Sequence, residues 1–89
     1  MTNITKYGQK SLYSVRNGQD KVLYSYTTPV AVLQSGEYFV TSEWHSQTTT
    51  KHINFFLRHE KAAVSSKIPQ LTIQEKARQV LGENQLFIK

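Results

Sequence analysis

The sequence predicts a single α+β domain over residues 1–89, in which an antiparallel meander of three or four strands packs against two helices. Three observations lead to this prediction. Apolar residues alternate through the first half, two short turn signals divide that half, and the apolar spacing becomes helical after residue 50. We expect both helices to cover one face of the sheet, because a sheet of this size needs one buried face.

The first two strands are expected at residues 11–16 and 21–27. Asn17-Gly18 separates them, and both residues tolerate the positive φ of a tight hairpin turn. Alternation in the second strand directs three side chains to one face, namely Val22, Tyr24 and Tyr26.

Two further strands are expected at residues 30–34 and 37–42, joined by Ser35-Gly36. Pro29 cannot donate a hydrogen bond to a neighbouring strand, so we expect it at a strand start or at a sheet edge.

The first helix is expected from Thr50 onward, with Ile53, Phe56 and Leu57 on one face. A run of threonines precedes it, and a threonine hydroxyl is a suitable N-cap. Residues 62–71 show no clear period and are expected to form a loop.

The second helix is expected to start with a capping box formed by Thr72 and Glu75 and to end at Gly82. The apolar tail, residues 86–88, is expected to pack against the domain, and a last strand is one form that this packing can take.

Composition excludes several classes of protein. The chain has no cysteine, so disulfide scaffolds and cysteine zinc sites are excluded. No apolar run approaches the ~20 residues that span a bilayer, and no signal peptide is visible, so we expect a cytoplasmic protein without membrane contact. Eleven Lys and Arg against six acids give a net charge of +5, which favours polyanionic partners.

The start of the first helix is a candidate anion site. Backbone N–H groups and hydroxyls there can grip a phosphate, but the same residues can simply cap the helix. Both interpretations involve the same set: Ser46, Thr48, Thr49, Thr50 and His52.

One side of this helix is a candidate binding surface for nucleic acid or for a protein partner. Lys51, Phe55 and Arg58 are spaced to form one stripe, and Lys61 extends it. A phenylalanine between cations suits base stacking beside phosphate contacts. The alternatives are that Phe55 is covered within the monomer or lies at a homodimer contact.

Catalysis and metal binding are not expected. His45, His52 and His59 recur every seven residues, and His52 and His59 would lie about 10 Å apart along a helix, too far to share a metal ion. Neither paired carboxylates nor a nucleophile elbow is present. We therefore expect no enzyme activity and no cofactor.

Two segments carry distinctive patterns. Residues 23–31 contain a Ser-Tyr-x-Thr-Pro-Val-Ala pattern, and residues 46–53 follow a Ser-x-Thr-Thr-Ser-Lys-His pattern in which this chain has Thr50 instead of Ser. Together these segments resemble a family of small uncharacterised phage and bacterial proteins. The resemblance covers about residues 11–60. It implies a domain of unknown function, often encoded by mobile elements, and carries no activity to this chain. It also makes the helix start, including Lys51 and His52, the best-supported site.

These observations lead to two hypotheses. The first is a non-catalytic basic module that binds nucleic acid. The second is a phage-type accessory protein or inhibitor that binds a host protein.

Overall fold

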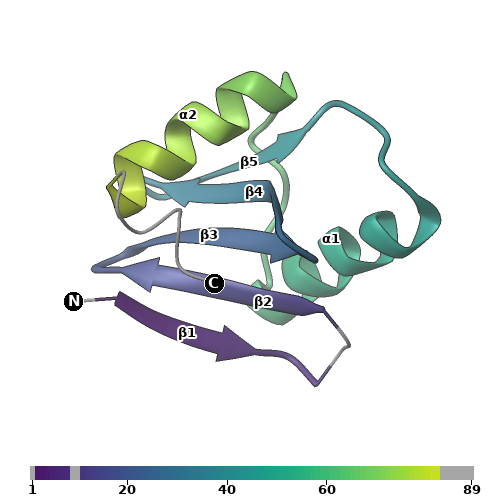
Figure 1. The fold of residues 1–89 in the computed structure, drawn as a ribbon, viewed down its shortest axis with the longest axis horizontal. Coiled ribbons are helices and arrows are strands. Elements are labelled where there is room, and N and C mark those ends of the chain that lie inside the picture. The colour runs from purple at the N-terminus through teal and green to yellow at the C-terminus, as the bar shows by residue number, and fades with distance from the viewer. Residues whose placement is uncertain (1, 9–10, 83–89) are drawn as a thin grey trace.

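A computed structural model describes residues 2–8 and 11–82 of the chain. It contains two helices and a six-stranded sheet. Figure 1 labels both helices and the strands β1 to β5. In chain order the elements are β1 Thr2–Lys6, β2 Leu12–Asn17, β3 Asp20–Ser25, β4 Thr28–Gln34, β5 Glu37–Thr41, α1 Gln47–Glu60, β6 Ser66–Ile68 and α2 Gln70–Leu81. The α+β class and the two helices are therefore confirmed.

The strands lie in the sheet in the order of the sequence, β1 to β6. Neighbours from β1 to β5 are antiparallel, whereas β6 runs parallel to β5. A parallel pair needs a long crossover, and α1 provides it. The expectation of three or four antiparallel strands was too low, because β1 and β6 were not predicted. β1 contains one strongly apolar residue, Ile4, and β6 has three residues within the expected loop.

The helices cover opposite faces of the sheet, so the expectation that both lie on one face was wrong. Val22 packs with Ile73 and Ala77 of α2, whereas its neighbour Leu23 packs in the cluster that contains Phe56 of α1. Successive side chains in a strand point to opposite faces. The uninterrupted burial of residues 22–25 is typical of a strand covered on both sides.

Three two-residue turns connect β2 to β5. The two predicted from glycine are present, with positive φ at Gly18 and at Ser35-Gly36. The third turn, Tyr26-Thr27, lies at the end of the strand expected at residues 21–27. The sequence does not predict this turn, because neither of its residues is glycine or asparagine. Tyr26 has φ 60°, and its N–H donates to the carbonyl of Ser11 at 2.7 Å.

The helix ends depart in part from expectation. Ser46, not a threonine, is the N-cap of α1, and its Oγ accepts from the Thr49 N–H at 3.1 Å. The capping box expected at Thr72 is wrong. The first residue of α2 lies two positions before Thr72, directly after the N-cap Pro69, so Thr72 is inside the helix. Gly82 does end α2, with φ 78°. The strand expected at residues 86–88 lies outside the described residues.

Candidate functional site

Three hydroxyl groups and one imidazole form a buried chain between β3 and the start of α1. Ser25 Oγ lies 2.8 Å from His52 Nδ1 and 3.1 Å from Thr49 Oγ1. Ser46 Oγ donates in turn to Thr49 Oγ1 at 3.2 Å. Hydroxyls can donate and accept, so every bond in this chain is satisfied when His52 is neutral and accepts at Nδ1.

This network stabilises the helix start and leaves no room for a substrate. Ser25 is 1% exposed and His52 is 4% exposed. Burial lowers the pKa of His52, which keeps the ring neutral. Of the set predicted to bind an anion or cap the helix, Ser46, Thr49 and His52 therefore bond within the fold. Thr50 Oγ1 also donates inward, to the Ser46 carbonyl at 3.1 Å, and Thr48 is exposed.

The solvent face of α1 carries the cations that helical spacing predicts on this side. Lys51 and Arg58 are exposed, and Lys61 follows at the left-handed residue that ends the helix. Asn54 lies between them, so that Lys51, Asn54 and Arg58 fall within an arc of about 60° on the helix. The end of this face borders an open depression of about 570 Å³, whose lining includes Asn54, Arg58 and Lys61.

Phe55 does not belong to this exposed face. It is half-buried and packs against the α1 core cluster, with its ring 6.0 Å from that of Tyr7 and 6.5 Å from that of His59. The helical wheel places Phe55 at the border of the polar face, and only the fold shows that Tyr7 covers it. The structure thus brings together three of the four predicted residues and separates the fourth.

The acid of α1 is neutralised at the far end of the helix. Glu60 accepts from Lys21 Nζ at 2.8 and 2.9 Å and from the Tyr38 hydroxyl at 3.0 Å. Burial raises the pKa of Glu60, but the hydrogen bonds from Lys21 and Tyr38 and the charge of Lys21 outweigh it, so the pKa lies below its usual range. Burial and the bond to Glu60 raise the pKa of Tyr38 to about 12. Glu60 therefore offsets Lys21 and leaves the cations of the solvent face unpaired among the described residues.

The three histidines occupy separate environments. His45 Nε2 lies 3.1 Å from Gln70 Oε1, His52 is in the buried network, and His59 Nδ1 is 3.5 Å from Glu60 Oε2. Within residues 2–8 and 11–82, no three histidine or acidic side chains gather as a metal site would require.

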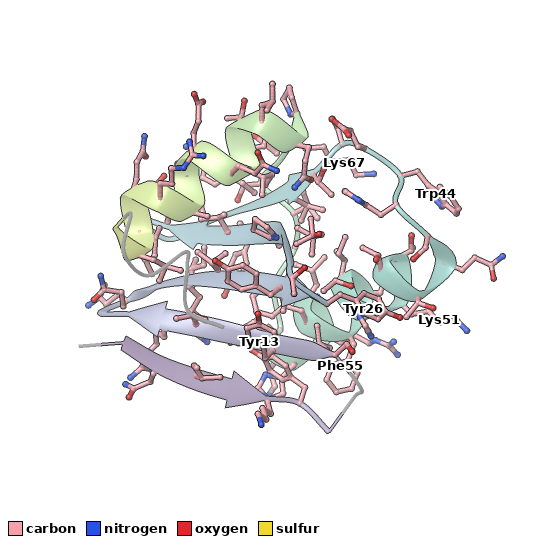
Figure 2. The ribbon with its side chains drawn as sticks, viewed as in Figure 1. Tyr13, Tyr26, Trp44, Lys51, Phe55 and Lys67 are labelled. Atoms are coloured by element: carbon pink, nitrogen blue, oxygen red, sulfur yellow. The ribbon has the colours of Figure 1, made fainter. Side chains whose placement is uncertain are left out.

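Two aromatic residues at the end where α1 begins were missed as binding candidates. Trp44 is 74% exposed and Tyr26 is 52% exposed. Figure 2 shows Trp44, Tyr26 and Lys51 on the side of the molecule where α1 begins, with Trp44 on the connection between β5 and α1. A lone tryptophan among polar neighbours, Ser42 to Ser46, was the signal available for Trp44, whereas Tyr26 appeared to continue a strand.

A family model described as a family of unknown function (DUF8033) matches residues 2–75. The chain belongs to this family. The DUF8033 match runs from β1 into the first half of α2, and it therefore includes the buried network, the cations of α1, Tyr26 and Trp44. Neither curated proteins nor solved structures gave a significant match. No described helix is long and apolar enough to cross a membrane.

Proposed function

We propose that this protein is a non-catalytic basic module that binds nucleic acid through the solvent face of α1. The observation that carries the proposal is the cluster of Lys51, Arg58 and Lys61, exposed on one helix, with no acid on that face. Cations in such an array neutralise phosphates, and the amide of Asn54 between them can hydrogen-bond to phosphate, sugar or base edges.

Charge balance supports the same proposal. The chain carries a net charge of +5, and the acid of α1 is already bonded to Lys21. The cations of the solvent face therefore retain their full charge for a partner, and the open depression beside Arg58 and Lys61 offers space for a sugar-phosphate segment. The proposal places the protein in a bacterial or phage-infected cytoplasm, where nucleic acid is accessible.

The test is the salt dependence of binding to labelled oligonucleotides. We expect affinity to fall steeply between about 50 and 200 mM salt, because each phosphate contact releases counterions. Replacing Lys51, Arg58 and Lys61 together by alanine is expected to reduce the slope of log K against log salt by about 2 to 3 units.

The matched control removes three exposed cations from other surfaces, at Lys6, Arg16 and Arg78. Both triple variants have the same net charge, so general attraction falls equally in each. Equal slopes for the two variants would refute a specific role for α1, and absence of binding at low salt would refute the proposal as a whole.

A further inference from the structure

Two large aromatic rings project into solvent at the end of the molecule where α1 begins (Figure 2). Trp44 and Tyr26 are both more than half exposed. Tryptophan is highly buried on average in folded proteins, so a ring this exposed requires an explanation. No described core cluster contains either ring.

The backbone at Tyr26 holds its ring in this position at a cost. Tyr26 is the first residue of the two-residue turn between Ser25 and Thr28, and its φ of 60° is one that such turns normally assign to glycine. A bulky residue in this conformation costs about 1–2 kcal/mol. The hydrogen bond from the Tyr26 N–H to Ser11 fixes the turn and therefore the direction of the side chain.

Gln70 joins the Trp44 loop to the strand that follows the Tyr26 turn. Its Nε2 donates to the Pro29 carbonyl at 2.7 Å, and its Oε1 lies 3.1 Å from Nε2 of His45, the neighbour of Trp44. The same side chain thus contacts both segments, and both rings are presented from an ordered surface. Such preorganisation reduces the entropy lost on binding.

The cations of α1 begin next to a residue that the Tyr26 ring approaches. The Tyr26 ring is 6.0 Å from that of His52, and Lys51 immediately precedes His52 at the start of the α1 solvent face. Exposed aromatic rings next to a track of cations are the surface that single-stranded nucleic acids use, since unpaired bases stack on the rings while phosphates contact the cations. In a duplex the bases already stack on one another.

We infer that the ligand is single-stranded nucleic acid, whose unpaired bases stack on Trp44 and Tyr26 while its backbone runs from Lys51 along α1. This inference rests on the proposed function and adds the strandedness of the ligand and two residues that contact it. It also assigns a role to the strain at Tyr26.

Trp44 itself reports binding, because it is the one tryptophan of the chain. Titration with an oligothymidylate of about 20 nucleotides is expected to quench its fluorescence, whereas a blunt duplex of similar length is expected to bind about tenfold more weakly and quench little. A labelled form of the same strand measures the affinity of variants that lack tryptophan.

Trp44→Ala and Tyr26→Asn are each expected to weaken single-strand binding about 5- to 100-fold without changing the salt slope, since stacking involves no counterion. Asparagine tolerates the positive φ at position 26. Trp44→Phe keeps a ring and is expected to retain most of the affinity. Circular dichroism and the melting temperature confirm that each variant is folded.

The outcomes separate this inference from the proposed function. Tight binding that depends on Lys51 and Arg58 but is unaffected by Trp44→Ala, or that favours the duplex, would overturn the inference and leave the α1 proposal standing. Binding of neither ligand would overturn both and would leave the two rings as a surface for a protein partner.

Discussion

The buried Ser25 hydroxyl bonds to two side chains of α1. Ser25→Ala removes one oxygen atom that bonds to both His52 and Thr49. Thr49 retains its bond from Ser46, but Nδ1 of His52 loses its partner in a site that water does not reach.

The expected cost follows from these contacts. Each lost bond contributes a net ~1 kcal/mol, and leaving a buried acceptor unpaired costs about 1–3 kcal/mol. We therefore expect Ser25→Ala to lower the free energy of unfolding by about 2–3 kcal/mol. In a domain of this size such a loss corresponds to a decrease in melting temperature of about 10–20 °C.

Chemical denaturation followed by circular dichroism measures this loss, and Ser14→Ala is the matched control. Ser14 is equally buried on the adjacent strand, but within residues 2–8 and 11–82 its Oγ has one bond, at 2.7 Å to the hydroxyl of the half-buried Tyr7. We expect the control to cost about 1 kcal/mol, because it breaks a single bond.

A double-mutant cycle tests the mechanism directly. Ser25→Ala with His52→Leu removes both partners, so the pair should cost at least about 1 kcal/mol less than the sum of the single changes. Additive effects, or a Ser25→Ala loss no larger than that of Ser14→Ala, would refute the network as an energetic unit.

Two further predictions concern pH and the two core layers. Folding lowers the pKa values of both His52 and Glu60. The stability that depends on neutral His52 is therefore lost as pH falls from about 6.5 through its folded pKa, and the stability that depends on charged Glu60 is lost as pH falls below about 4.5. Urea denaturation at a series of pH values should show both steps, and a Glu60→Gln variant that kept the lower step would contradict the assignment. Phe56→Ala is expected to cost about 3–5 kcal/mol and Ile73→Ala about 2–5 kcal/mol, because both side chains are fully buried. The two costs should add within about 0.5 kcal/mol, because the side chains lie on opposite faces of the sheet. Denaturant unfolding curves of both single variants and the double variant, all measured in the same stabilising salt, provide the check, and strong coupling would argue against separate layers.

The sequence was sufficient for elements whose signal is local. The strands from β2 to β5 follow from alternation and from Gly18 and Gly36, and α1 follows from its apolar period. The Tyr26 turn was missed because its positive φ occurs at a residue type that avoids it, and tertiary contacts with Ser11 maintain it. β6 was missed because three residues carry no period.

For the candidate site too, the sequence predicts what local spacing determines and misses what distant contacts determine. Helical spacing placed Lys51 and Arg58 on one side of α1 correctly. The cover over Phe55 comes from Tyr7, 48 positions earlier in the chain, and the partner of the buried His52 ring is Ser25, 27 positions earlier. Spacing within one helix contains no information about either contact.

The sheet between the two helices also affects how this protein can change over time. The strands between the helices contribute side chains to two separate cores, and the layer under α2 contains no residue from the surface of α1. Substitutions on the outer side of α1 therefore leave the α2 layer intact. Under the proposed function, such substitutions change the ligand while the α2 layer preserves the folded scaffold.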